Sequence, residues 1–221
     1  TWAALKEAKK PRLQLKAPMS PTQMEYFWHK KPDKMIEAIS ALITVCRAKC
    51  ADVEFIAAHP MAGRERSGVE YSDDRVFIGA NYIITPTERN TPEAIEACKT
   101  LGEVLGFARI TELSPEEHDR MIAFLSQLTH CIAITLMTCN DKENMEKFTG
   151  DSFRDLTRIA RINDLMWSEL FAANKDVLLE QMNLFIGKFN DLKTMLERDD
   201  IDGMRAMMRH STERRALFDK K

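Results

Sequence analysis

The feature that most constrains the fold is the helical spacing of apolar residues, which begins at Ser114 and continues almost to the last residue. Ser114-Pro115-Glu116-Glu117 has the form of a capping box with proline at the first helical position. It opens a long predicted helix, and the spacing indicates that the second half of the chain consists of helices packed on one another. The predicted core positions of this first helix are Met121, Ile122, Leu125, Leu128, Ile132 and Leu136.

A polar break at residues 140–144 precedes a second helical stretch, which runs from Phe153 to Phe218. Asn163 and Asn174 are predicted helix caps, and residues 200–202 mark a further helix boundary. Methionines at helical spacing are more often core or helix–helix interface than a cofactor site. We therefore expect these helices to pack against a second copy of themselves. The methionines are Met166, Met182, Met195, Met204, Met207 and Met208.

The first half of the chain carries short strand signals separated by one helix. Val53–Ala58 predicts a strand buried on both faces, and Tyr82–Thr85 predicts a second strand. Thr91-Pro92-Glu93 is typical of a helix start. That helix is expected to stop near Gly106, before a third strand at Phe107–Thr111. Strand, helix and strand at this spacing indicate the end of an α/β sheet.

The N-terminal residues are harder to interpret. Four prolines interrupt residues 1–32, and an amphipathic helix is predicted from Asp33 onwards. Residues 1–50 hold ten Lys and Arg against four acidic residues, whereas the whole chain has a net charge of −2. A basic arm can bind nucleic acid or an anionic cofactor. Without interleaved aromatic residues or a binding motif, a solvated surface is the better interpretation, and no nucleic-acid partner is expected.

The composition is that of a globular protein with one large or two small domains, since 44% of the 221 residues are hydrophobic and 30% are charged. No apolar run reaches the length of a membrane span and no signal-peptide pattern is present, so we expect a cytoplasmic protein without a membrane partner. Five cysteines without paired spacing fit reduced thiols. Cys46 and Cys50 lie four apart, but no second pair completes a zinc site, and no metal is expected.

The stretch from His59 to Gly68, His-Pro-Met-Ala-Gly-Arg-Glu-Arg-Ser-Gly, is predicted to leave the first strand as a loop. Pro60 favours an extended backbone at His59, and the two glycines permit turns. Histidine transfers protons readily near neutral pH, so a histidine at a strand exit is a candidate catalytic group. A single histidine before a proline is nevertheless more often an ordinary loop residue.

The His-Pro-Met-Ala-Gly segment resembles that of the prephenate/arogenate dehydrogenase family, the dehydrogenases of the tyrosine pathway. Further motifs that resemble this family follow in the same order, and together they extend the resemblance from Val53 into the C-terminal helices. They are Ser114-Pro115-Glu116-Glu117-His118-Asp119, Ser126-Gln127-Leu128-Thr129-His130, the run from Ser152 to Ala160, and Met166-Trp167.

The resemblance implies an α/β fold followed by an all-α fold, mainly helical overall. Residues 1–112 would form an incomplete Rossmann-like nucleotide-binding domain, carrying the last strands of its sheet. Residues 113–221 would form a helical substrate-binding and dimerisation domain, of the kind found at the C-terminus of 6-phosphogluconate dehydrogenase. A homodimer through the helical domain is expected.

The activity implied is NAD- or NADP-dependent oxidative decarboxylation of prephenate to 4-hydroxyphenylpyruvate. Arogenate is the alternative substrate, and tyrosine is a possible feedback inhibitor. The first glycine in the chain is Gly63, so residues 1–62 cannot hold the Gly-x-Gly-x-x-Gly turn that cradles a pyrophosphate. Cofactor-binding residues are therefore not assigned. The rival interpretation is a catalytically inactive helical dimer that keeps a dicarboxylate pocket as a sensor.

The family match assigns roles to particular residues. His59 and Ser126 are the expected catalytic residues, at the ring hydroxyl of the substrate. His130 is expected near the pyruvyl end, and Arg158 is expected to bind carboxylate as a bidentate fork. Additional substrate-site residues are Arg154, Glu65 and Trp167, and the expected gating or structural residues are Asp119 and Asp155.

Several of these residues also have simpler interpretations. Arg154 and Arg158 lie four apart and are expected on one helical face, which can equally be a solvated face paired with Asp151 and Asp155. His130 can be a satisfied core histidine, and Trp167 a core aromatic. Gln127 and Thr129 replace the His and Pro of the commoner family motif, which weakens the argument for a bend in this helix.

Overall fold

The computed structural model describes five separate residues near the N-terminus, Glu37, Ser40, Ala41, Thr44 and Ala48, together with residues 54–63 and 73–219. The five separate residues are helical. Other predictions made for the N-terminal part lie outside the described residues: residues 1–32, the apolar face of the helix after Asp33, Cys46, Cys50, Arg64 and Glu65.

The chain divides into two compact units. The first comprises residues 1–115 and 162–170, and the second comprises residues 116–161 and 171–221. A small sheet occupies the first unit, whereas the second is helical, so the predicted fold class of an α/β part followed by an all-α part is confirmed.

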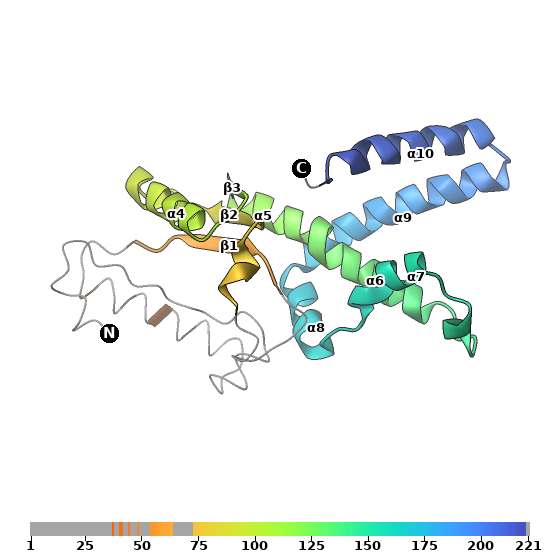
Figure 1. The fold of residues 1–221 in the computed structure, drawn as a ribbon, viewed down its shortest axis with the longest axis horizontal. Helices are drawn as coiled ribbons and strands as arrows, with labels where there is room; N and C mark the ends of the chain where they lie inside the picture. The colour runs from red at the N-terminus through yellow and green to blue at the C-terminus, as the bar shows by residue number, and fades with distance from the viewer. Residues whose placement is uncertain are drawn as a thin grey trace. The chain divides into compact units, whose positions relative to one another are not determined.

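The sheet of the first unit has three strands in the order β1-β2-β3. β1 (Ala57–Met61) is antiparallel to β2 (Asn81–Thr85), and β2 is parallel to β3 (Arg109–Glu112). Helix α4 (Pro92–Val104) connects β2 to β3 and packs on both strands, as Figure 1 shows. A short 3-10 helix, η2 (Asp74–Phe77), precedes β2. The parallel crossover through a helix is the βαβ arrangement of nucleotide-binding sheets.

The core of this unit lies between the sheet and α4. Ile84 is fully buried, and Tyr82 stacks on Phe107 with ring centroids 4.7 Å apart. The Tyr82 hydroxyl lies 3.4 Å from Cys98 Sγ, and burial raises the pKa of this phenol above its ordinary value. Glycine at position 102 lets α4 approach the sheet, because a Cβ there would lie 2.8 Å from Tyr82 Cδ1.

The predictions of β2 and α4 hold, whereas β1 and β3 differ from their predicted bounds. β2 and α4 lie where the sequence placed them, with Thr91 as the N-cap and Gly106 at φ +80° just after the helix. The prediction of β1 was wrong: the strand begins at Ala57 rather than Val53, and its residues are half-buried or exposed rather than buried on both faces. His59 therefore lies inside the strand and not in a loop after it. β3 begins at Arg109, two residues later than predicted.

The second unit is built around one helical rod. It consists of α5 (Pro115–Ile122), the π-helical turn η3 (Ala123–Leu128) and α6 (Thr129–Thr138). The 3-10 helix η4 (Met145–Lys147), α7 (Asp151–Thr157) and the 3-10 turn η5 (Arg158–Ala160) follow, and α7 and η5 pack on α6.

Three further helices complete the chain: α8 (Asp164–Ala173), α9 (Lys175–Glu197) and α10 (Ile201–Ala216). α9 packs on η3, and α10 folds back along α9 as an antiparallel hairpin, drawn in blue in Figure 1. The turn between them has Asp199 at φ 52°, and the Asp200 carboxylate caps α10 by accepting from Gly203 N–H.

The sequence predicted where these helices lie, but not all of their caps and buried faces. The cap at Asn163 is confirmed, and so is the helix boundary at residues 200–202, where Asp200 is the N-cap of α10. Asn174 stands at the N-cap position of α9, but its side chain makes no capping bond there, so that prediction was wrong in its mechanism. The predicted core face of the rod was partly wrong as well, because Leu125 is 46% exposed while Ala123 and Gln127 are buried.

The rod from Pro115 to Thr138 is long and apolar enough to cross a membrane, by length and composition alone. The expectation that no stretch reaches this length is therefore corrected. Its apolar composition has a structural explanation within the second unit, because α7, η5 and α9 all pack against the rod. The polar side chains of Ser126, Gln127 and His130 also interrupt it midway.

Candidate functional site

His59 lies on the face of the sheet that is turned away from α4. It pairs across β1 and β2 with Ile83, which in turn pairs with Thr111 on β3. The alternate residues Ala58 and Ile84 belong to the core against α4, so His59, Ile83 and Thr111 form a row on the opposite face. The imidazole is half-buried. A half-buried histidine on a rigid strand suits proton transfer better than one on a loop.

Ser126 and His130 come together at the π-turn. His130 Nδ1 lies 2.8 Å from the main-chain carbonyl oxygen of Ser126. The hydroxyl and the backbone N–H of Thr129 also donate to that oxygen, the hydroxyl at 2.6 Å. Both Ser126 and His130 are half-buried. The two residues thus contact each other through the serine carbonyl, at the junction of the π-turn and α6.

A second set of hydrogen bonds holds the π-turn from outside. Asn174 Nδ2, at the start of α9, donates to Gln127 Oε1 and to the carbonyl oxygen of Asp119, each at 3.0 Å. Gln127 is 4% exposed, so this amide pair fixes a buried polar group. The roles of Gln127, Thr129 and Asn174 were not predicted from the sequence. The only signal was the departure of the Ser-Gln-Leu-Thr-His motif from the commoner family pattern.

Arg154 is an exposed residue whose partners lie in its own segment. Its guanidinium donates to Asp151 at 2.6 Å and to the carbonyl oxygen of Thr149 at 3.3 Å. An exposed ion pair of this type contributes little to stability. The simpler interpretation, a solvated charged face, is therefore confirmed for Arg154 with Asp151.

Arg158 is the C-cap residue of α7, which ends at Thr157, and it begins the 3-10 turn η5. That Arg154 and Arg158 share one helical face stays a prediction. Arg158 is exposed, and its element packs directly against α6, the helix that carries His130.

The remaining predicted site residues lie on other elements. Asp155 is exposed on α7, and Trp167 is half-buried on α8 in the first unit. Asp119 is exposed on α5, with Oδ1 3.1 Å from His118 Nδ1. Glu65 lies outside the described residues.

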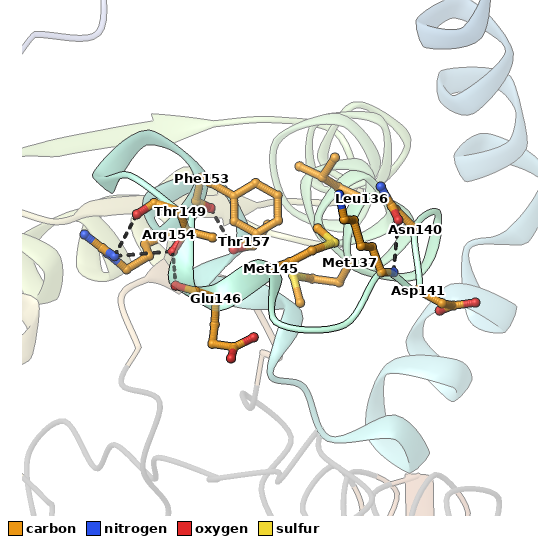
Figure 2. Close-up of a pocket in the computed structure, with 11 residues that line it drawn as sticks. Leu136, Met137, Asn140, Asp141, Met145, Glu146, Thr149, Phe153, Arg154 and Thr157 are labelled. Atoms are coloured by element: carbon orange, nitrogen blue, oxygen red, sulfur yellow. Dashed lines mark hydrogen bonds between the residues drawn. The ribbon is translucent and has the colours of Figure 1, made fainter.

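A hollow of about 640 Å³ lies at the other end of α6, shown in Figure 2. Leu136, Met145 and Phe153 supply its apolar wall. Two of its polar side chains bond within their own segment: Thr157 Oγ1 donates to the Phe153 carbonyl at 2.7 Å, and Arg154 donates to Asp151 and to the Thr149 carbonyl. Of the predicted site residues, only Arg154 lines this hollow.

The described residues do not provide a cradle for a dinucleotide pyrophosphate. Such a cradle needs closely spaced glycines at the start of a helix. Gly79 and Gly106 serve turns, Gly102 packs against the Tyr82 ring, and Gly63 follows β1. Within residues 54–63 and 73–219, no group of three or more His, Cys, Asp or Glu side chains is placed to hold a metal ion.

Comparisons with known proteins connect both halves of the chain to one family. The profile of the prephenate dehydrogenase nucleotide-binding domain matches residues 39–111, and the profile of the prephenate dehydrogenase dimerization domain matches residues 114–210. The prephenate dehydrogenase of Bacillus subtilis (strain 168) is 33% identical over 156 residues, which are 68% of this chain and 42% of that protein.

Two other proteins show the same relationship to this family. The cyclohexadienyl dehydrogenase of Zymomonas mobilis is 29% identical over 153 residues, 66% of this chain and 52% of that protein. The crystal structure of Aquifex aeolicus prephenate dehydrogenase in complex with hydroxyphenyl propionate and NAD+ superposes with a TM-score of 0.68 at 30% identity, covering 75% of this chain and 59% of that one.

The chain thus spans about two fifths to one half of the curated relatives it matches. Within that span, the nucleotide-binding and dimerization profiles follow one another in the family's order, and the boundary between them falls between β3 and α5. The chain belongs to the prephenate/arogenate dehydrogenase family.

Proposed function

We propose that this chain is part of a prephenate dehydrogenase, which converts prephenate to 4-hydroxyphenylpyruvate with loss of carbon dioxide in tyrosine biosynthesis. The observation that carries the proposal is the family membership of both halves of the chain together with His59, Ser126, His130 and Arg158 at the matching positions. A module that only mediates an interaction would not need all four.

The chemistry asks three things of the protein. His59 accepts a hydrogen bond from the ring hydroxyl and draws its proton as that carbon becomes a carbonyl. Arg158 binds a carboxylate with its planar fork, and His130 contacts the side-chain end of the substrate. Ser126 assists at the ring hydroxyl. Loss of the ring carboxylate then restores an aromatic ring, so the protein orients the reactant rather than activating a leaving group.

NAD+ or NADP+ is the proposed acceptor of the hydride from the ring carbon. Support comes from the nucleotide-binding profile over residues 39–111 and from the A. aeolicus relative, whose crystal structure is a complex with NAD+.

Five other residues are proposed in supporting roles. Arg154, Glu65 and Trp167 would line the substrate site, and Asp119 and Asp155 would gate or support it. The exposed ion pair between Arg154 and Asp151 means that Arg154 must exchange partners to reach a substrate. Arg154 is therefore the weakest member of this set.

A homodimer through the helical domain is also proposed. The α9–α10 hairpin leaves a row of large apolar side chains uncovered within one chain, including Phe189 at 61% exposed and Leu196 at 65%. A surface of this kind marks an interface. A molar mass of one chain by light scattering would contradict the dimer.

Three further features are proposed. The boundary between the two domains lies at residues 112/113, and tyrosine acts as a feedback inhibitor. The protein is cytoplasmic, and the free thiols of Cys98, Cys131 and Cys139 support this location.

Two alternatives remain as outcomes of the test. Arogenate carries an amino-acid side chain in place of the pyruvyl group of prephenate, and the Z. mobilis relative is named only as a cyclohexadienyl dehydrogenase. The second alternative is an inactive dimer that binds a dicarboxylate.

The test is a comparison of His59→Asn with His210→Asn, which makes the same change at an exposed position on α10. His59→Asn should lower kcat roughly 100- to 10,000-fold with little change in KM, since it removes the general base. His210→Asn should leave both constants unchanged. Unaltered turnover in His59→Asn would remove the catalytic role.

A further inference from the structure

The main-chain carbonyl of Ser126 receives an unusual set of donors. Thr129 donates to it twice, through its backbone N–H and through its hydroxyl at 2.6 Å. The third contact is from His130 Nδ1 at 2.8 Å, between residues four apart on the same rod. A π-turn is rare and often lies at a functional site. Here it brings a histidine ring to the oxygen of the preceding turn.

This contact specifies which ring nitrogen of His130 carries the proton. A carbonyl oxygen can only accept a hydrogen bond, whereas each imidazole nitrogen can donate or accept according to the tautomer. The 2.8 Å contact therefore requires a proton on Nδ1. In the neutral ring the lone pair then lies on Nε2, the nitrogen at the tip of the side chain.

We infer that the Ser126 carbonyl holds His130 in the Nδ1–H tautomer, and that His130 therefore binds a ligand carboxylate through Nε2 only by taking up a proton. A carboxylate has no hydrogen to donate, and the lone pair of neutral Nε2 repels it. With a second proton, Nε2 donates a charge-assisted hydrogen bond. An ammonium group in the same place needs no added proton, because neutral Nε2 accepts from it.

The charged side chains on the elements packed against α6 are Arg158 on η5 and Asp151, Arg154 and Asp155 on α7, while η3 carries none. On α6 itself, burial raises the pKa of the Cys131 thiol, which keeps that thiol protonated. Proton uptake on ligand binding is assigned to His130 by its loss when that residue is replaced.

This inference rests in part on the proposed function, in which His130 faces the side-chain end of the substrate. It deepens that proposal by making His130 a residue that distinguishes an acidic side chain from an amino one. Prephenate presents a keto acid at this end, and arogenate presents an α-ammonium group beside its carboxylate. Raising the pH should therefore weaken the binding of prephenate more than that of arogenate.

The tautomer can be tested without any ligand. Protein labelled with 15N-histidine is examined by long-range proton–nitrogen correlation above the titration range of imidazole, and the His130 signals are identified by their loss in His130→Gln and in His130→Asn. We expect a protonated Nδ1 and an unprotonated Nε2. A protonated Nε2 would overturn the inference, whatever the protein's substrate.

The second part of the inference, proton uptake on carboxylate binding, is the ligand half. It is tested by calorimetry with two compounds that share a 4-hydroxyphenyl ring, namely 3-(4-hydroxyphenyl)propionate and tyramine. Each is titrated in two buffers that differ in ionisation enthalpy. The carboxylate should bind with uptake approaching one proton, and tyramine with none. The uptake should disappear in His130→Asn, whose amide keeps the donor to Ser126 but lacks the second nitrogen.

The outcomes separate the two proposals. Carboxylate binding without proton uptake would overturn the inference and leave the proposed function standing. Absence of binding by both compounds would count against the proposed substrate site, and with it against the ligand half of the inference, while the tautomer would still be decided by the nitrogen spectra.

Discussion

Gly102 is the position at which a single added methyl group should disturb the first unit most. A Cβ at this position would lie 2.8 Å from Tyr82 Cδ1 and 2.9 Å from Ile110 Cδ1. The Tyr82 ring has little room to move, since it is 7% exposed, stacks on Phe107 and contacts Cys98 through its hydroxyl. Overpacking a core of this kind costs about 1–3 kcal/mol.

Alanine also improves the helix, so the net effect of Gly102→Ala is a difference between two terms. The helix gains about 1 kcal/mol when alanine replaces an interior glycine. With two contacts under 3.0 Å, the cost should lie in the upper part of its range, which leaves a net destabilisation of about 1–2 kcal/mol. For a unit of about this size, the expected fall in Tm is roughly 4–16 °C.

Gly187→Ala is the matched control. Gly187 lies inside α9, and a Cβ there would meet nothing within 4 Å. The same substitution should therefore stabilise the protein by about 1 kcal/mol. Urea unfolding followed by circular dichroism measures both variants, and hydrogen exchange should show faster opening of α4 and β2 only in Gly102→Ala. Equal stabilisation by both substitutions would refute the close packing of α4 on the sheet.

Two further predictions concern charged groups. Arg158→Ala should weaken prephenate binding by about 1.5–3 kcal/mol, roughly 10- to 100-fold. Arg161→Ala, at an exposed site three residues further along the chain, should leave the affinity unchanged. Equal apparent affinities of the two variants for prephenate in a steady-state assay would show that Arg158 does not bind the carboxylate. Glu54 accepts from Thr91 N–H and Oγ1 at 2.8 and 2.7 Å, and these bonds lower the pKa of its carboxyl below 4.5 in the folded state. The stability it contributes is therefore present above pH 4.5 and is lost as the pH falls through the folded pKa. Glu54→Gln should be less stable than the wild type at pH 7 and should show less loss of stability on acidification; identical acid profiles in urea titrations would contradict this.

Local signals were sufficient for part of the fold. The Thr91-Pro92 start and the glycine after the helix define α4 within the sequence itself, and β2 has both strand composition and a proline just after its end. β1 was misplaced because its extent is set by pairing with β2, from Ala57 opposite Thr85 to Met61 opposite Asn81. Pairing over that distance along the chain is not visible in local composition.

The candidate site residues come from sequence motifs, which carry no information on the local geometry around them. The family motif identifies Ser126 and His130 as candidate residues. It does not predict the π-turn that contains Ser126, because Ser-Gln-Leu-Thr-His is compatible with an ordinary α-helix. Leu125 is exposed and Gln127 is buried, against the helical spacing, and both lie within the π-turn.

The most direct test of the account is product analysis after mixing the purified protein with prephenate and NAD+, and in parallel with NADP+. The account predicts that, with one of the two nucleotides, 4-hydroxyphenylpyruvate, carbon dioxide and reduced nicotinamide form in equal amounts, and that His59→Asn forms them far more slowly. Formation of none of these products with either nucleotide, and no oxidation of arogenate under the same conditions, would contradict it.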